Sequence, residues 1–139
     1  MASKIYVNLP VKSLDRSVRF FTRLGFRFDP QYTDENATCM VVGDNIYVML
    51  LVEAFFKTFT PNPVCDATRS TEVIVCLSSD HRKAVDEMVR NAVAAGAKTF
   101  NPPKDHGFMY QHGFQDLDGH LWEIMCMEPA VISIGPSDV

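Results

Sequence analysis

Two carboxylates, Glu72 and Glu123, are the residues whose types and surroundings point most directly to chemistry. Glu123 stands inside LWEIMCM, a run typical of a strand, which follows an Asp-Gly turn signal at 118–119. Because side chains alternate between the faces of a strand, Glu123 lies opposite Trp122 and Ile124. A carboxylate among apolar residues needs hydrogen bonds, water or a cation. The pattern therefore predicts that Glu123 faces a cavity rather than the core.

Glu72 belongs to a second strand-like run, for which we expect the range 71–77. Val73, Val75 and Leu77 make one apolar face, which leaves Glu72 on the other. Two carboxylates that face one concave space repel each other and raise one pKa. A divalent cation between them would neutralise both, whereas a polar cavity could hold them by hydrogen bonds alone. The residue pattern leaves these alternatives open.

The elements that must position these residues occur in two similar halves. In the first half, Ser13 is a predicted helix cap and Gly25 a predicted helix end. In the second half, Ser79 and Gly96 have the same roles. We expect helices at 14–24, 53–59 and from Ser79 to Gly96, and strands at 5–11, 27–32, 38–42, 46–51, 71–77, 98–100, 108–114 and 120–127.

Two shifts relate the halves to each other. A shift of 66 residues carries Tyr6 onto Glu72, and a shift of 74 residues carries Met49 onto Glu123. A longer helix in the second half accounts for most of the difference between the two shifts. Each half is then a β-α-β-β-β unit that covers only one face of its sheet, so two units must pair to close a core. The expected boundaries are 4–60 for the first module, 60–70 for a linker, 70–128 for the second module and 129–139 for a tail.

Other candidate cavity residues come from strand alternation. Tyr6, Asn8, Tyr47 and Met49 lie on strand faces that mix polar and apolar side chains, as a ligand cavity requires. In the range 108–114, Tyr110 and His112 share one face and are included as cavity residues. The pattern does not decide which face of that strand points inward.

The modules resemble a known group of proteins. A first module that reads VNLPVKSLDRSVRFFTRLGF and a second that ends in DLDGHLWEIM are similar to the vicinal oxygen chelate superfamily. The resemblance implies an α+β fold in which two paired βαβββ modules form a curved, partly open mixed β-sheet cavity with the helices outside. It also implies four ligand places in metal-using members, here held by Tyr6, Met49, Glu72 and Glu123. Tyr6 stands where His is usual, and Met49 stands where Glu or no ligand is usual.

Three functions follow as hypotheses. The first is a glyoxalase-like protein that binds a small oxygenated or amphipathic molecule in the cavity, with an incomplete metal-ligand set. The alternative is a divalent-metal-dependent lyase, isomerase or dioxygenase that uses Glu72 and Glu123 as metal ligands or for proton transfer. Glyoxalase I activity itself is disfavoured by Tyr6 and Met49 at ligand places. Metal-free acid–base catalysis by the two glutamates is a third hypothesis.

Composition excludes some partners and suggests others. The net charge of −4, without a basic cluster, gives no electrostatic case for nucleic acid, and the longest apolar runs are too short to span a membrane. No secretion signal is recognisable, and four cysteines without a Cys-x-x-Cys pair favour reduced thiols in a cytoplasmic protein, with Cys76 and Cys126 in the core. We expect a small-molecule ligand and a homodimer, with Phe55, Phe56 and Phe59 as a candidate contact.

Overall fold

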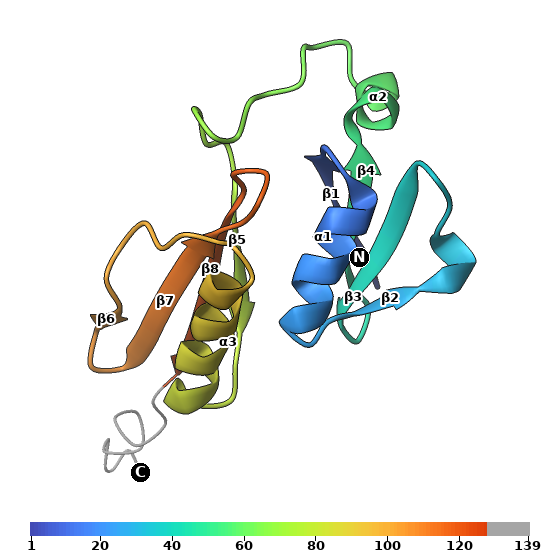
Figure 1. The fold of residues 1–139 in the computed structure, drawn as a ribbon. Helices are drawn as coiled ribbons and strands as arrows, with labels where there is room; N and C mark the ends of the chain where they lie inside the picture. The colour runs from blue at the N-terminus through green and yellow to red at the C-terminus, as the bar shows by residue number, and fades with distance from the viewer. Residues whose placement is uncertain (128–139) are drawn as a thin grey trace. The chain divides into compact units, whose positions relative to one another are not determined.

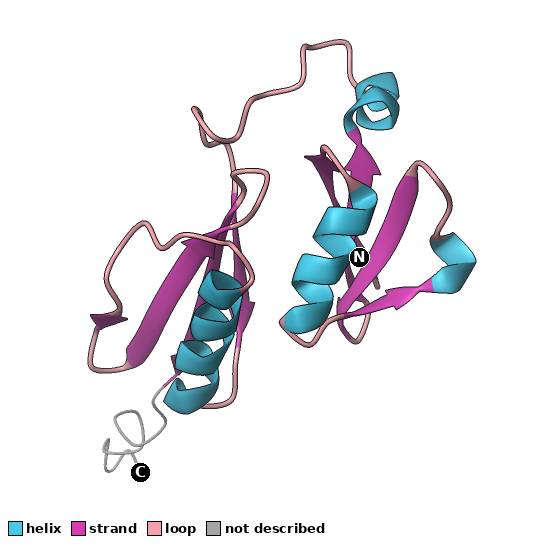
Figure 2. Cartoon of the chain, viewed as in Figure 1, coloured by secondary structure: helices cyan, strands magenta, loops and turns pink. Residues whose placement is uncertain are grey.

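The computed structural model describes residues 1–127, which form two compact units, one from Met1 to Ser70 and one from Thr71 onward. Each unit is a four-stranded sheet with one longer helix against one face (Figures 1 and 2). The α+β class and the repeated βαβββ order are therefore confirmed. The predicted tail at 129–139, and residue 128, lie outside the described residues.

The first unit contains a sheet with the strand order β1-β4-β3-β2. β1 and β4 are parallel, and the other neighbours are antiparallel. Its elements are β1 Ile5–Val11, α1 Leu14–Arg23, β2 Arg27–Asp29, the 3-10 turn η1 Pro30–Tyr32, β3 Ala37–Gly43, β4 Ile46–Val52, α2 Glu53–Phe56 and the 3-10 turn η2 Lys57–Phe59.

α1 begins and ends where the sequence predicts. The Ser13 hydroxyl accepts a hydrogen bond from the backbone N–H of Arg16 at 3.2 Å, which satisfies one of the free donors of the first turn. Gly25 has a φ of 101°, a left-handed conformation that stops the helix. Phe20 and Phe21 on the inner face are buried, so α1 covers the apolar face of its sheet.

The second unit has the equivalent strand order β5-β8-β7-β6, with β5 and β8 parallel. The β8–β7 and β7–β6 pairs are antiparallel. Its elements are β5 Ile74–Ser78, α3 Arg82–Ala94, β6 Lys104–Asp105, β7 Met109–Gln115 and β8 Leu121–Met127.

Three predicted elements of this unit need correction. β5 begins at Ile74 rather than at residue 71, because its partner strand β8 begins at Leu121, which pairs with Ile74. α3 is capped not by Ser79 but by His81, whose Nδ1 accepts a hydrogen bond from the N–H of Ala84 at 3.2 Å. The strand predicted at 98–100 is reduced to one bridge from residue 98 to 115, and the edge strand is β6 instead.

The cysteine prediction is partly wrong as well. Cys126 is buried as expected, but Cys76 is exposed and Cys39 is the second buried thiol. Cys76 is exposed because it lies on the face of β5 that α3 does not cover, whereas Cys126 is on the helix-covered face of β8.

The turn between β7 and β8 is organised by a buried carboxylate that the sequence reading did not single out. Asp116 accepts hydrogen bonds at 2.9 Å from the N–H groups of Asp118 and His120 and from the indole Nε1–H of Trp122. Gly119, with a φ of 95°, makes the left-handed step of the turn. The turn sets the register of the two strands, and therefore the position of Glu123.

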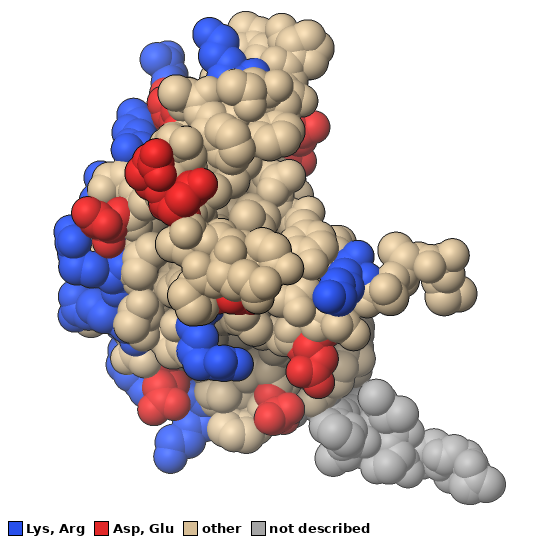
Figure 3. Space-filling model, turned by 90° about the vertical axis from the view of Figure 1, so that its right-hand side faces the viewer, with Lys and Arg blue, Asp and Glu red and all other residues tan. Residues whose placement is uncertain are grey.

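Charged side chains of both signs are present on the face of the molecule that Figure 3 shows. Many of the basic side chains on this face lie along its left-hand edge, with acidic side chains beside them. Between residues 1 and 127, no helix is long and apolar enough to cross a membrane.

Candidate functional site

Glu123 lies on the open face of the second sheet. Its neighbours Trp122 and Ile124 are 0% and 1% exposed on the face that α3 covers, whereas Glu123 is half-buried on the other face. The predicted alternation of β8 is therefore confirmed. A sheet face without a helix over it gives the carboxylate access to water and ligands.

A glycine on the neighbouring strand makes room for this carboxylate. Gly113 of β7 pairs directly with Glu123 of β8, so the two side chains share one face. A Cβ at position 113 would lie 3.1 Å from Glu123 Oε2 and 3.2 Å from Glu123 Cδ. It would also lie only 2.3 Å from the backbone oxygen of Trp122. The Glu123 side chain thus lies across Gly113, in space that a larger residue would occupy.

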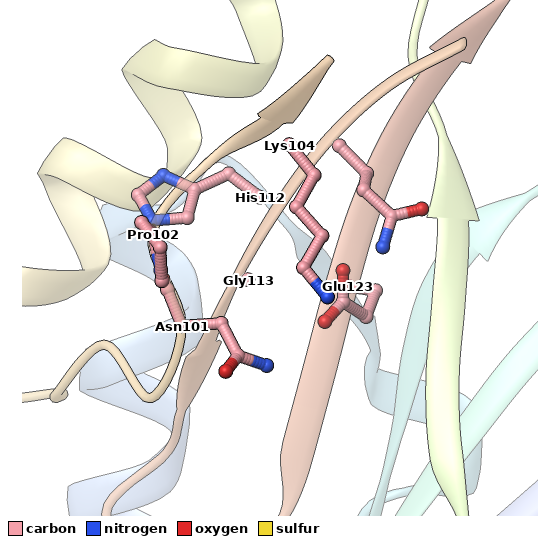
Figure 4. A pocket seen from close by; sticks show the side chains of 7 residues that line it. Asn101, Pro102, Lys104, His112, Gly113 and Glu123 are labelled. Atoms are coloured by element: carbon pink, nitrogen blue, oxygen red, sulfur yellow. The ribbon is translucent and has the colours of Figure 1, made fainter. Parts of the chain in front are cut away.

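A shallow polar pocket opens beside this pair. Its volume is about 40 Å³, enough for two or three water molecules or one small functional group and far less than a site that encloses a drug-sized molecule. Figure 4 shows the Lys104 side chain directed towards the Glu123 carboxylate. The lining residues are Asn101, Pro102, Lys104, Gln111, His112, Gly113 and Glu123.

The electrostatics of Glu123 reflect burial and two basic neighbours. Burial raises the pKa of the Glu123 carboxyl above its ordinary value, because removal from water disfavours the charged form. His112 and Lys104 oppose this effect and lower the pKa, but do not cancel it. One carboxyl pKa was predicted to rise, and it does, but burial is the main cause and repulsion by Glu72 is not among the causes.

Glu72 does not lie beside Glu123 on the sheet. It is exposed and precedes β5, and the residue of β5 that pairs with Glu123 is Cys76, four positions further along the chain. Four extended residues span roughly 13 Å. The predicted pairing of the two glutamates is therefore corrected.

The error came from the alignment of the two halves. Asn8 pairs with Met49 in the first unit, as Cys76 pairs with Glu123 in the second. The back shift of 74 from Met49 to Glu123 holds, but the front shift, from position 8 to position 76, is 68 rather than 66. An error of two residues preserves the face of a strand, so the predicted face was right while the predicted neighbour was wrong.

The candidates of the first unit come together as two cross-strand pairs. The rings of Tyr6 and Tyr47 stack with their centroids 4.9 Å apart, and Asn8 lies opposite Met49. Tyr6 is 51% exposed, whereas Leu9, on the other face of β1, is buried. These four side chains share the open face of the first sheet, as predicted.

Tyr110 and His112 lie on the other face of β7 from Glu123. Tyr110 is buried against α3, and its hydroxyl donates a hydrogen bond to Asp86 at 2.5 Å. The Nε2–H of His112 donates to the backbone oxygen of Asn101 at 3.1 Å, since a carbonyl can only accept. Tyr110 is therefore no part of the Glu123 surface, and His112 borders the pocket from the side (Figure 4).

Five pocket residues were missed at the sequence level: Asn101, Pro102, Lys104, Gln111 and Gly113. Gln111 and Gly113 could have been found from alternation, because they lie on one face of β7 together with Gln115. The pairing of β7 with β8 puts this face on the same side of the sheet as Glu123. Lys104 had no signal, since the two-residue strand β6 follows an unpatterned stretch and is recognisable only from its pairing with β7.

The second unit offers a poor donor set for a metal ion. The pocket contains one carboxylate, and Lys104 directs an ammonium group towards it, which a divalent cation would have to displace. Within residues 1–127, no group of three or more His, Cys, Asp or Glu side chains is arranged to hold a metal ion. The tentative metal pair of Glu72 and Glu123 does not fit this geometry.

Comparisons with known proteins find one matching family model and many solved structures with a similar fold. A family model described as "Bleomycin resistance protein-like N-terminal" matches residues 5–43. No curated protein matches the chain. A solved structure of a hypothetical protein from S. aureus is 26% identical, covers 91% of this chain and 95% of its own, and superposes with a TM-score of 0.77.

Two further solved structures carry names that describe a family. A glyoxalase/bleomycin resistance protein/dioxygenase family enzyme from Burkholderia phytofirmans PsJN has a TM-score of 0.74 at 17% identity, over 88% of this chain and 97% of that one. A genomically encoded fosfomycin resistance protein from Listeria monocytogenes has a TM-score of 0.66 at 15% identity, over 94% and 98%.

The chain has the vicinal oxygen chelate fold. The resemblance of the two sequence motifs to this superfamily is confirmed. This fold accounts for the repeated βαβββ units and the open sheet faces, but it does not assign a reaction, because one fold can host many activities.

Proposed function

We propose that this protein binds a small oxygenated molecule on the open face of its second sheet, with Glu123 as the polar anchor. The observation that carries this proposal is the half-buried Glu123 carboxylate, which lies across Gly113 in a polar pocket. A carboxylate with a raised pKa, held where no helix covers it, is a common feature of functional sites. Binding without a metal agrees with a pocket that combines one carboxylate with an ammonium group.

The test is a binding screen with small hydroxy- and oxo-compounds, monitored by the backbone N–H signals of Gly113 and Glu123. We expect ligands to shift these signals and Glu123→Gln to weaken their binding by at least tenfold while the fold is retained. Asp15→Asn is the matched control, because Asp15 lies in the first turn of α1, in the first unit, and is not one of the residues that line the pocket. Equal binding by wild type and Glu123→Gln would move the site elsewhere.

Acid–base catalysis by Glu123 is a second candidate function, favoured by the raised pKa of its carboxyl. It differs from simple binding by turnover. A ligand found in the screen is therefore incubated with the protein and analysed by mass spectrometry, together with exchange of its acidic C–H hydrogens in heavy water. A ligand recovered unchanged and without exchange supports binding alone.

The metal-dependent alternative, with Glu72 and Glu123 as ligands, is disfavoured by the separation of these two residues and is tested by direct measurement. Protein purified without added metal is analysed for metal content, and its thermal unfolding is then followed with a series of divalent cations. A ligand that binds only the native state raises the unfolding temperature. A stoichiometric metal whose stabilising effect is lost in Glu123→Gln would overturn metal-free binding.

We also propose that the protein acts as a cytoplasmic homodimer. The rings of Phe55 and Phe59 contact each other edge to face at 5.1 Å, and Phe59 remains 66% exposed, a large apolar side chain without cover in its own unit. Light scattering is expected to give twice the chain mass of 15.6 kDa. Phe59→Ser should shift the mass towards the monomer, and a monomeric wild type at micromolar concentration would contradict the proposal.

A further inference from the structure

The edge strand β6 presents its two side chains to opposite faces of the second sheet. Lys104 pairs with Gln111 and Asp105 pairs with Tyr110 across β7. Because cross-strand partners share a face, Asp105 lies on the side of α3 and Lys104 lies on the open side with Glu123. The direction of the Lys104 side chain in Figure 4 agrees with this register.

A set of contacts on the helix side holds β6 in place. Arg82 of α3 forms an ion pair with Asp105 at 3.0 Å, and its guanidinium carbon lies 4.3 Å from the centre of the Tyr110 ring. Tyr110 in turn donates to Asp86 on the same helix. The ion pair is exposed, and pairs of this kind contribute little to stability. Its clearer effect is positional, since it attaches the strand that carries Lys104 to a rigid helix.

The pocket therefore presents two opposite charges that do not neutralise each other directly. In the described chain, Lys104 and Glu123 form no direct ion pair, and both border the same small cavity. An anion alone would meet the Glu123 carboxylate, and a cation alone would meet Lys104. A ligand that satisfies both must offer an acceptor to one residue and a donor to the other.

We propose that the pocket takes the acid end of a small α-hydroxy or α-amino acid, with its carboxylate on Lys104 and its hydroxyl or ammonium hydrogen on Glu123. The cavity of about 40 Å³ suits such an end and leaves the rest of the molecule outside. The ammonium of Lys104 forms a charge-assisted hydrogen bond with the carboxylate, which is stronger than a bond to a neutral carbonyl. This assignment rests on the proposed binding function and adds the ligand class.

Three probes of similar size separate the two contacts. Glycolate carries both groups, acetate lacks the donor and glycolamide lacks the negative charge. Dissociation constants are measured from the Gly113 and Glu123 backbone N–H signals at low and high salt. We expect glycolate to bind at least tenfold more tightly than either of the others, with an affinity that falls as salt screens the Lys104 charge.

Two substitutions then test the named residues. Lys104→Met should weaken glycolate binding at least tenfold and leave glycolamide binding nearly unchanged, and Lys104→Arg should restore most of the affinity. Arg82→Met should weaken glycolate binding by a smaller factor although Lys104 is intact. Lys83→Met is the charge-matched control, because Lys83 is an exposed residue of α3 that does not line the pocket. Far-UV circular dichroism and thermal unfolding confirm the fold of each variant.

The outcomes distinguish this inference from the function on which it rests. If glycolate and glycolamide bind equally, or if Lys104→Met changes neither, the acid assignment is wrong while binding at Glu123 stands. If no probe, and no compound of the wider screen, shifts the Gly113 and Glu123 signals, both proposals fail. A loss of glycolate binding equal in Lys83→Met and Lys104→Met would reduce the effect to overall charge and overturn the role of Lys104.

Discussion

Replacement of Gly113 by alanine is the sharpest perturbation that the structure offers. A Cβ at this position would lie 2.3 Å from the backbone oxygen of Trp122, whereas real Cβ atoms essentially never come within 3.0 Å of another heavy atom. The backbones of β7 and β8 must therefore separate locally by about 0.7 Å, the difference between these distances. The obstacle is backbone rather than a flexible side chain, so a rotamer change cannot relieve it.

The expected loss of stability in Gly113→Ala follows from the effect of adding a methyl group to a packed region. Extra methyl groups forced into packed regions destabilise by about 1–3 kcal/mol. An unfolding entropy of about 2.1 cal/mol/K per residue amounts to about 0.3 kcal/mol/K for 139 residues. If the chain unfolds in one transition, a loss of about 2 kcal/mol lowers the unfolding temperature by about 7 °C. The same shift moves the Glu123 carboxylate, so ligand binding should fall as well.

The matched control is Gly43→Ala in β3. A Cβ there would meet the Cδ1 atom of Ile46 at 3.6 Å, an ordinary contact, and Gly43 has no positive φ. This substitution should be neutral or stabilise by up to about 1 kcal/mol, through the lower entropy of the unfolded chain. Both variants are measured by urea and thermal unfolding.

A double substitution separates the two obstacles. Glu123→Ala removes the contacts of the new methyl group with the carboxylate, but the oxygen of Trp122 remains, so Gly113→Ala should still cost most of its free energy in that background. Wild-type stability of Gly113→Ala, with unchanged ligand binding, would refute the close approach of the two strands.

Three further predictions concern titration and hydrogen bonding. Glu123→Gln should stabilise the protein at pH 8 but not at pH 4. Because burial raises the pKa of Glu123 in the folded state, the unfolded chain loses this proton at lower pH than the folded protein does, and the wild type loses stability as pH rises through the two pKa values. Glutamine has no such proton, so the variant does not lose this stability. A stability difference independent of pH would contradict the burial effect. The hydrogen bond to Asp86 raises the pKa of Tyr110 to about 12, so the difference between the alkaline absorbance titrations of wild type and Tyr110→Phe should appear near pH 12. The contribution of this hydrogen bond to stability should disappear as pH rises from about 10 through 12. Ionisation of that phenol near 10 would exclude the bond. Asp116→Asn replaces one of the two accepting oxygens of the side chain by an amide donor. It should lower the free energy of unfolding by about 1–3 kcal/mol and speed hydrogen exchange of the Trp122 indole N–H. Unaltered stability would show that water replaces the lost acceptor.

Local pattern accounts for much of the fold. The Ser13 cap, the left-handed Gly25 and the alternation around Glu123 all depend on residues close in sequence, and each behaves as predicted. The repeat also indicated two βαβββ units. These features are predictable because capping, turn conformation and strand alternation are properties of short segments.

The sequence by itself determined which face of β8 carries Glu123, but tertiary structure decided what lies beside it. Register between strands distant in the chain placed Cys76 rather than Glu72 next to Glu123, and it turned Tyr110 towards α3. No local pattern specifies such pairing, because a slip of two residues leaves the apolar and polar faces of a strand unchanged. Lys104 reaches the pocket for the same kind of reason: a two-residue strand has no periodicity of its own, and only its pairing with β7 sets the direction of its side chains.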